Sequence, residues 1–205
     1  MSDKVLQIAI IGDPFVGKSS FITSYFGDVF SDVHIPTLLE SDVCEIKINN
    51  KSHKIKLIDT IRNSNIDYST IDLIILCYSI ENRMSYRNIK TKWIDELKKL
   101  PNWPIPFVLV ATKVDLREEF PDVFFITSED CENLSKEIEA SKYFEVSAKD
   151  NVNVKHIVEH SVKILYPEEQ KVDDKIAVFQ PIASNGSQQY AESRVNQKNS
   201  SCCCC

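Results

Sequence analysis

The sequence of 205 residues lacks a long apolar run, an excess of basic residues and an internal repeat. Its most apolar stretch, residues 71–80, contains Asp72 and is far shorter than the roughly 18 residues of a membrane-spanning helix. We therefore expect no membrane span, and we find no signal peptide before the first apolar segment. Lys and Arg number 24 against 30 Asp and Glu, a formal net charge of −6. This balance excludes nucleic acid as the main partner.

The cysteines do not form a disulfide pattern. Cys44, Cys77 and Cys131 are scattered through segments that we expect to be structured, and the other four residues of this type end the chain. Paired cysteines in a secreted domain show a different spacing. The distribution indicates a cytosolic protein with reduced thiols.

Residues 12–19 read Gly-Asp-Pro-Phe-Val-Gly-Lys-Ser, which is a G-x-x-x-x-G-K-[ST] phosphate loop. The apolar segment Val5–Ile11 before it predicts a strand, and Ser20–Phe26 after it predicts a helix. Backbone N–H groups of such a loop surround phosphates, and the helix N-terminus adds its positive dipole end. Lys18 can reach the β- and γ-phosphates, and the Ser19 hydroxyl can ligate Mg²⁺. The motif predicts a nucleoside triphosphate site but does not choose the base.

Apolar strand-like segments alternate with helical patterns along the chain. This alternation predicts an α/β fold, a mostly parallel six-stranded sheet with helices on both faces. Asn49-Asn50 predicts a hairpin turn and therefore one antiparallel pair. The expected strands are Val5–Ile11, Val43–Ile48, Lys54–Ile58, Leu73–Tyr78, Phe107–Ala111 and Tyr143–Val146. The expected helices are Ser20–Phe26, Ile89–Leu100, Ser128–Ala140 and Val152–Leu165.

The periodic pattern ends at Pro167, so we expect one folded domain over residues 1–167. Residues 168–201 are rich in Ser, Gln, Asn and charged residues and show no sustained period. This composition predicts a disordered tail over residues 168–205, which ends in four cysteines.

Two further motifs select a base. Thr112-Lys113-Val114-Asp115 follows the strand at 107–111, and Ser147-Ala148-Lys149 follows the next strand. The Asp115 carboxylate can accept hydrogen bonds from the N1–H and the 2-amino group of guanine, whereas adenine offers neither. A backbone N–H near Ala148 can bind guanine O6. Together with the phosphate loop, and in this order, the motifs indicate a guanine nucleotide site.

At this point the chain resembles the Ras superfamily of small GTPases and, within it, the Rho family. Asp13 inside the phosphate loop, His34–Glu40, Lys92-Trp93, residues 112–117 and residues 126–149 are similar to Rho segments. The resemblance covers residues 4–167 and extends to the terminal cysteines. It implies a small GTPase domain over residues 1–167 that uses GTP, GDP and Mg²⁺.

The resemblance also implies individual roles. Phe30 and Lys113 would pack on the base, Thr37 would ligate Mg²⁺ and contact the γ-phosphate, and Asp59 would hold the metal through water. Ser19, Thr37 and Asp59 are thus the predicted metal site. The predicted nucleotide-binding residues are Gly12, Asp13, Pro14, Phe15, Val16, Gly17, Lys18, Ser19, Ser20, Phe30, Thr37, Asp59, Thr112, Lys113, Asp115, Leu116, Ser147, Ala148 and Lys149.

The chain departs from the family where GTP is hydrolysed. Family members read Asp-Thr-Ala-Gly-Gln after the third strand, whereas this chain reads Asp-Thr-Ile-Arg-Asn at 59–63. Arg62 and Asn63 replace the Gly that senses the γ-phosphate and the Gln that orients water, so the catalytic residues stay unknown and these two are only weak candidates. Arg62 is either a solvated loop residue or an internal arginine finger. Pro14 replaces a loop glycine, removes one N–H and fills space that a partner's arginine finger needs.

The terminal cysteines predict a lipid anchor. Cys202 is the acceptor in a C-a-a-X reading of the last four residues, and Cys204 and Cys205 are the acceptors if a paired-cysteine signal is used. Only Arg194 and Lys198 lie just upstream, so no polybasic patch supports the anchor. One lipid binds membranes only marginally, and we therefore expect a second lipid on a neighbouring cysteine.

Taken together, these residues predict a Rho-like GTP-binding switch with weak or absent hydrolysis, which the family links to the actin cytoskeleton. The alternative is a GTPase-deficient scaffold that recruits effectors without cycling. Expected partners are effectors at Thr37–Glu40, exchange factors and Rho-type dissociation inhibitors. We expect the protein on the cytoplasmic face of a membrane, the plasma membrane first, with a cytosolic pool. His156–His160 also fits the zinc pattern H-x-x-E-H, but we favour an ordinary surface helix there.

Overall fold

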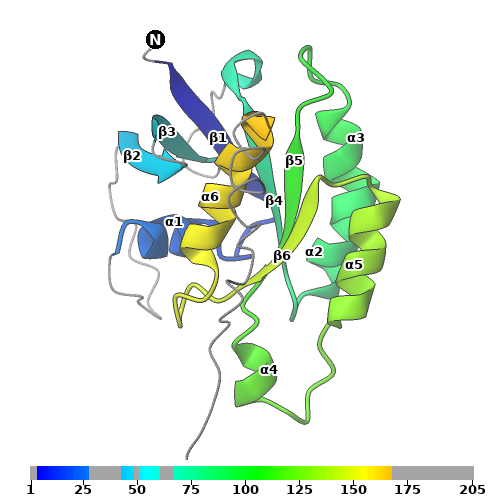
Figure 1. The fold of residues 1–205 in the computed structure, drawn as a ribbon. Coiled ribbons are helices and arrows are strands. Elements are labelled where there is room, and N and C mark those ends of the chain that lie inside the picture. Colours follow the sequence, from blue (N-terminus) through cyan, green and yellow to red (C-terminus); the bar gives the residue numbers. More distant parts are fainter. Residues whose placement is uncertain (1–3, 28–42, 49–50, 61–66, 168–205) are drawn as a thin grey trace, which may run out of the picture.

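The computed structural model describes residues 4–27, 43–48, 51–60 and 67–167. Six strands form one sheet in the order β2-β3-β1-β4-β5-β6 (Figure 1). The strands are β1 (Val5–Gly12), β2 (Val43–Ile48), β3 (Lys51–Asp59), β4 (Leu73–Ser79), β5 (Phe107–Thr112) and β6 (Lys142–Val146). Only β2 and β3 pair antiparallel, and the remaining neighbours are parallel. The predicted fold class is therefore confirmed, although the predicted turn at Asn49-Asn50 lies outside the described residues.

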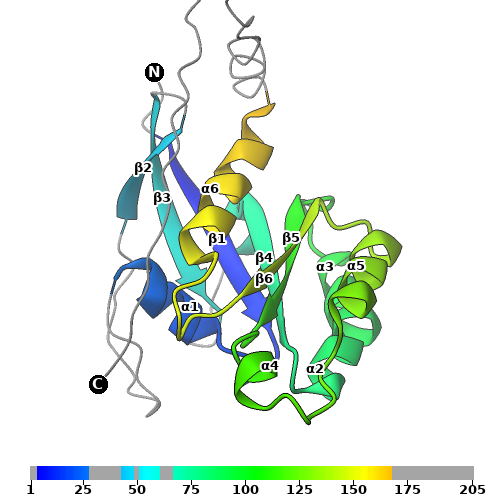
Figure 2. The same cartoon turned by 60° about the horizontal axis from the view of Figure 1, so that its bottom comes forward.

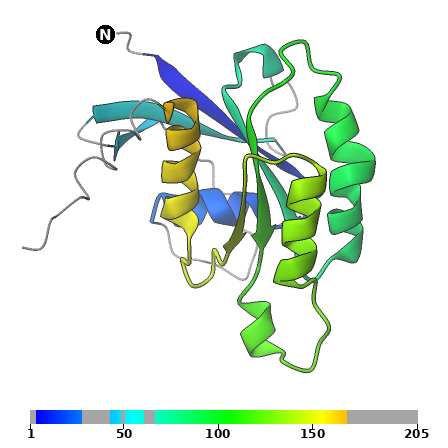
Figure 3. The same cartoon turned by 45° about the vertical axis from the view of Figure 1, so that its right-hand side comes forward.

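Helices cover both faces of the sheet. The helical elements are α1 (Lys18–Tyr25), η1 (Tyr68–Thr70), α2 (Arg83–Asn88), η2 (Ile89–Trp93), α3 (Ile94–Leu97), α4 (Leu116–Glu119), α5 (Ser128–Glu137) and α6 (Val154–Leu165). Figures 2 and 3 show α1 and α6 on one face and the α2–η2–α3 helix with α5 on the other. This arrangement agrees with the sequence-based expectation of helices on both faces.

The two faces are built by the period-2 alternation of the central strands. In β4, Leu73, Ile75 and Cys77 join the core beneath α1 and α6. The alternate residues Ile74, Leu76 and Tyr78 join the core beneath α3 and α5. Strand β4 is buried along its whole length, as expected of a central parallel strand. The apolar stretch at 71–80 is thus a buried strand.

Helix boundaries differ from the sequence-based expectation by up to three residues for α1, α5 and α6, and by more for the α2–η2–α3 helix. The helix expected at Ile89–Leu100 begins earlier, at Arg83, because the Asn82 side chain accepts hydrogen bonds from the N–H groups of Met84 and Ser85. The short α4 was not expected. Helix α5 begins at Ser128 as expected, and Thr127 is its N-cap, since Thr127 and Asp130 form a reciprocal capping box.

Candidate nucleotide-binding site

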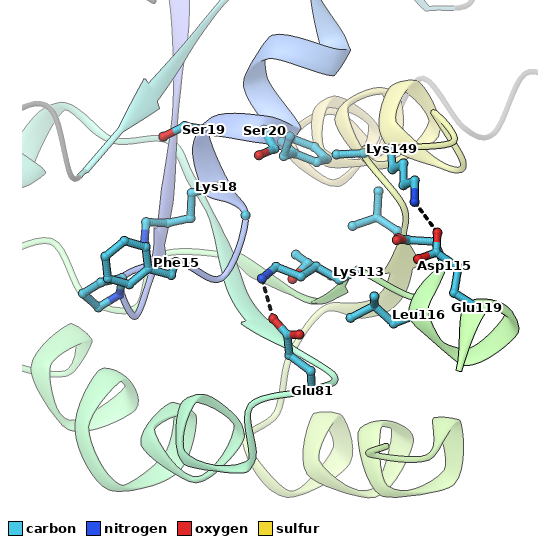
Figure 4. A pocket seen from close by; sticks show the side chains of 16 residues that line it. Phe15, Lys18, Ser19, Ser20, Glu81, Lys113, Asp115, Leu116, Glu119 and Lys149 are labelled. Carbon is cyan, nitrogen blue, oxygen red and sulfur yellow. Dashed lines mark hydrogen bonds and ion pairs between the residues drawn. The ribbon is translucent and has the colours of Figure 1, made fainter. Parts of the chain in front are cut away.

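A cavity of about 500 Å³ lies at the carboxyl edge of the parallel strands (Figure 4). Loops that follow β1, β4, β5 and β6 line it, which is the usual place for a ligand in an open α/β sheet. Residues from all three sequence motifs are brought together there. The lining residues are Pro14, Phe15, Gly17, Lys18, Ser19, Ser20, Phe21, Glu81, Thr112, Lys113, Asp115, Leu116, Glu119, Val146, Ala148 and Lys149.

The phosphate loop begins where β1 passes very close to β4. Gly12 has a φ of +147°, and a Cβ there would lie 2.1 Å from the carbonyl oxygen of Cys77. Only glycine therefore fits this position. Phe15 also has a positive φ, 64°, and its side chain is 86% exposed at the edge of the cavity. Backbone strain at a non-glycine residue of this kind concentrates at functional sites.

Lys18 is almost completely buried at the start of α1. Its Nζ donates hydrogen bonds to the carbonyl oxygens of Gly12 and Asp13 at 2.7 and 2.6 Å. Burial lowers the pKa of Lys18, and the nearby carboxylates of Asp59 and Asp13 oppose that shift. A buried ammonium group held by two carbonyls, inside a cavity, is a ready counter-charge for a phosphate.

The parallel register of β1 and β3 brings Asp59 to the phosphate loop. Ile10 is opposite Asp59, which ends β3, and the Ser19 hydroxyl donates a hydrogen bond to the Asp59 carboxylate. A hydroxyl and a carboxylate oxygen at one point are the hard oxygen donors that Mg²⁺ prefers. These two residues therefore fit the predicted metal site, where Mg²⁺ would neutralise charge on the phosphates. The third predicted ligand, Thr37, lies outside the described residues.

Thr112 ties the base motif to the phosphate loop. Its buried hydroxyl contacts the carbonyl oxygens of Val16 and Tyr78 at 2.5 and 2.9 Å. Since that hydroxyl is engaged within the protein, Thr112 shapes the cavity and does not offer a free polar group. Within the described ranges no hydrogen bond engages the carboxylate of Asp115, which is half-buried at the cavity. It is available to the two guanine donors.

Two lysines of the base motifs form ion pairs across the cavity (Figure 4). Lys113 contacts Glu81 at 2.5 Å, and Lys149 contacts Glu119. Sequence reasoning missed both glutamates. Glu81 follows β4 at the carboxyl edge of the sheet, so the general position of α/β ligand sites is the pattern that would have found it. Glu119 lies one helical turn after Asp115, on the same side of α4.

Several other predicted site residues do not line the cavity. Val16 is fully buried in the core, and Ser147 is a buried loop residue whose hydroxyl accepts a hydrogen bond from Asp150 N–H at 3.0 Å. Asp13 is held from outside the loop, as described below. Phe30, Thr37, Arg62 and Asn63 lie outside the described residues, as does the tail with Cys202. Their assigned roles stay predictions.

An ion pair between Arg117 and Glu145 supports the base end of the cavity, the end that carries Asp115. The Arg117 guanidinium donates to both carboxylate oxygens of Glu145, each at 2.9 Å. Burial raises the pKa of Glu145, but hydrogen bonds from Arg117, Tyr143 and Ser128 outweigh burial and lower it overall. Arg117 also donates to the carbonyl of Ile126 at 2.9 Å. The segment that carries Asp115 is thereby fixed to β6 and to the entrance of α5.

His156 and His160 both pack against one aromatic ring. Their rings each pack edge-on against Phe144, with centroids 5.6 and 5.2 Å away. No cluster of three or more metal-ligating side chains occurs among the residues that the structure describes. This agrees with the interpretation of α6 as an ordinary amphipathic helix, whose apolar side faces the core.

The fold and the site define a P-loop nucleotide-binding protein. Its phosphate loop precedes α1, the oxygens of Ser19 and Asp59 lie beside that loop, and the Asp115 carboxylate lies at the opposite end of the cavity. The family model described as "Ras family" matches residues 7–166. The chain is also 32% identical over 168 residues to the Ras-like GTP-binding protein RhoL of Drosophila melanogaster, an alignment that covers 79% of this chain and 87% of the relative. The chain belongs to the Ras family of small GTPases. It is a GTP-binding switch of the Ras superfamily.

Proposed function

We propose that this protein is a Rho-like member of the superfamily that binds GTP and GDP with Mg²⁺ and hydrolyses GTP weakly or not at all. The observation that carries the proposal is the contrast within one cavity. Lys18, Ser19 and Asp115 line the cavity together, which supports nucleotide binding, while Pro14 and Phe15 on the phosphate loop are exposed to solvent. The Rho-type segments named above, such as Lys92-Trp93, support the narrower assignment.

Binding follows from the residues of this chain. Lys18 and the loop N–H groups would hold the β- and γ-phosphates, and the Asp115 carboxylate would accept the guanine N1–H and 2-amino hydrogens. Ser19 and Asp59, together with Thr37, would hold Mg²⁺, which neutralises phosphate charge when it is bound. All of these contacts except those to the γ-phosphate would be made with GDP as well as with GTP.

Hydrolysis needs an oriented water and stabilisation of charge on the transferred phosphoryl group. Arg62 and Asn63 replace the residues that the family uses beside the γ-phosphate. Pro14 and the 86% exposed Phe15 would stand in the way of an arginine finger from a partner. The same facts favour the second candidate, a scaffold that keeps its nucleotide and recruits effectors through Thr37–Glu40 without cycling.

The proposed location is the cytoplasmic face of a membrane, for which we favour the plasma membrane. A second pool of the protein would be cytosolic. None of the described helices is long and apolar enough to cross a bilayer. We propose a lipid on Cys202, or on Cys204 and Cys205, in the tail at 168–205 that follows the GTPase domain at 1–167. Rho-type dissociation inhibitors, exchange factors and cytoskeletal effectors are the proposed partners.

A single-turnover assay tests the function most directly. The protein is purified, its bound nucleotide is identified by chromatography, and loaded GTP is followed over time with and without a Rho-type activating protein. We expect bound guanine nucleotide and slow hydrolysis. Bound ATP would contradict the guanine assignment, and fast, strongly stimulated hydrolysis would contradict the proposed deficiency.

A further inference from the structure

The Asp13 carboxylate is held by a helix outside the phosphate loop. Its Oδ2 accepts a hydrogen bond from Asn88 Nδ2 at 2.7 Å, and its Oδ1 accepts one from Trp93 Nε1 at 2.9 Å. All three residues are half-buried. Hydrogen bonds to a charged partner are about twice as strong as neutral ones. The loop is therefore fastened, by both oxygens of one carboxylate, to the α2–η2–α3 helix.

The π-helical turn η2 explains how two residues five positions apart reach one carboxylate. In an α-helix, with about 100° per residue, residues i and i+5 would point roughly 140° apart. A π-helix closes its hydrogen bonds five residues apart, and here the Ile94 N–H bonds to the Ile89 carbonyl. Asn88 and Trp93, which flank and end this turn, consequently share a face. Single π-turns are rare and frequently occur at functional sites.

Asp13 is fixed at its backbone as well as at its side chain. Its carbonyl oxygen accepts the Lys18 ammonium at 2.6 Å, so the loop residue is bound on one side by α1 and on the other by η2. Among the residues that the structure describes, Asp13 does not line the cavity. Its negative charge is thus engaged by neutral N–H donors away from the phosphate position, and it need not repel a nucleotide.

Pro14, the residue after Asp13, makes this support of the loop important. Pro14 has no N–H, so the loop must bind phosphates with the groups that follow it, from Phe15 onward. Phe15 is itself in a strained, left-handed conformation with φ 64°. A loop that is short of one donor and strained at the next residue depends on an external support to keep its remaining N–H groups directed inward.

We propose that Asn88 and Trp93 are positioning residues for the phosphate loop, acting through Asp13. The inference rests on the proposed guanine nucleotide site and extends it to a helix outside the cavity. Because the Trp93 indole donates a hydrogen bond to the loop, we expect its fluorescence to depend on whether the site is occupied.

The two tryptophans of the chain provide a matched pair of variants. Trp93→Phe keeps an aromatic ring and removes the N–H to Asp13. Trp103→Phe makes the same change at a half-buried residue that packs on Phe107, with ring centroids 6.1 Å apart, away from the phosphate loop. We expect Trp93→Phe to accelerate GDP dissociation about 10- to 100-fold, the value of one hydrogen bond to a charged group. The Trp103→Phe variant should dissociate GDP like the unmodified protein.

A double-mutant comparison separates positioning from general loosening. Once Asp13→Ala has removed the carboxylate, adding Trp93→Phe should accelerate dissociation no further. Additive effects would overturn the proposal. Asn88→Ala, which removes only the bond to Oδ2, is the second variant if Trp93→Phe fails to fold.

Fluorescence supplies an independent readout. In Trp103→Phe the only tryptophan is Trp93, and its emission should change when GDP is released by chelation of Mg²⁺ and excess apyrase. In Asp13→Ala/Trp103→Phe that change should be lost. A protein that binds no guanine nucleotide refutes the proposed function and this inference with it. A protein that binds GDP normally, with Trp93→Phe and Trp103→Phe indistinguishable, refutes this inference alone.

Discussion

The base end and the phosphate end of the cavity differ in how far they depart from the family pattern. At the base end, Asp115 and Ala148 line the cavity, and Arg117 with Glu145 fixes their support. At the phosphate end, Lys18 and Ser19 line the cavity, but Pro14 replaces the family's loop glycine and the neighbouring Phe15 is 86% exposed. We therefore expect nucleotide binding and GTP hydrolysis to depend on separable parts of one site.

The largest effect is expected at the base end. Asp115→Asn replaces an acceptor with a group that carries donors, so the guanine N1–H and amino group lose their partner. Sites built on such polar contacts discriminate by about 10⁴–10⁵-fold, and we expect GTP affinity to fall by about 10³-fold or more while xanthine nucleotides bind better. Competition binding with labelled GDP measures this change.

Asp122→Asn is the matched control for that variant. It makes the same substitution on an exposed residue of the loop after α4 and should leave nucleotide affinity unchanged. Equal affinity of the unmodified protein for ATP and GTP would remove the assigned role of Asp115.

Activating proteins should accelerate GTP hydrolysis far less in this protein than in other members of the superfamily. Finger-type stimulation reaches about 10³–10⁵-fold, and we expect little of it here because Pro14 would fill space that the finger needs, with the exposed Phe15 beside it. Single-turnover hydrolysis with and without a Rho-type activator gives the ratio. Pro14→Gly/Phe15→Ala should raise the stimulated rate more than the intrinsic rate.

Restoring Gly at 62 and Gln at 63 should not by itself rescue stimulated hydrolysis, because Pro14 would still fill space that a partner's arginine finger needs. Full rescue by Arg62→Gly/Asn63→Gln would mean that these two residues alone account for the deficiency. Strong stimulation of GTP hydrolysis in the unmodified protein would contradict the proposed difference between the base end and the phosphate end.

Membrane attachment should be independent of both ends of the cavity. Each buried lipid CH₂ contributes about 0.8 kcal/mol, so one chain gives reversible attachment and two give a stable one. Removal of Cys202–Cys205 should move the protein to the cytosol and leave GDP affinity unchanged. Fractionation, with mass spectrometry of the terminal peptide, measures both the location and the lipid.

Single sites in the tail separate the two lipidation signals. Cys202→Ser should abolish attachment if the C-a-a-X signal is used, whereas Cys204→Ser/Cys205→Ser should matter most for a paired-cysteine signal. A tail-less protein that still sediments with membranes would refute the anchor.

The smallest effect is expected on stability at the base end. The pKa of Glu145 is lowered in the folded protein below its ordinary value near 4.3. Its contribution is therefore fully present above about pH 5 and is lost as pH falls through the folded pKa. Glu145→Gln should cost roughly 1–3 kcal/mol at pH 7, with a smaller difference at acid pH, measured by urea unfolding. A difference that does not shrink toward acid pH would contradict this role.

The sequence by itself determined the six strands, the phosphate loop and the two base motifs. These features depend on local patterns, namely period-2 or fully apolar runs and fixed spacings of Gly, Lys and Asp, which neighbouring residues encode. The start of the α2–η2–α3 helix was not predicted, because Asn82 caps it through side-chain hydrogen bonds that a propensity pattern does not reveal.

Tertiary structure decided which residues meet. Asp13 joins Asn88 and Trp93, Lys113 joins Glu81, and Arg117 joins Glu145, all across wide separations in sequence. The π-turn that aligns Asn88 with Trp93 has no sequence pattern of its own. The need for Gly12 comes from its φ of +147° and from the Cys77 carbonyl oxygen of β4, which would lie 2.1 Å from a Cβ there. Contacts of this kind arise when parallel strands bring their carboxyl ends to one edge, so they depend on the whole sheet and not on any one segment.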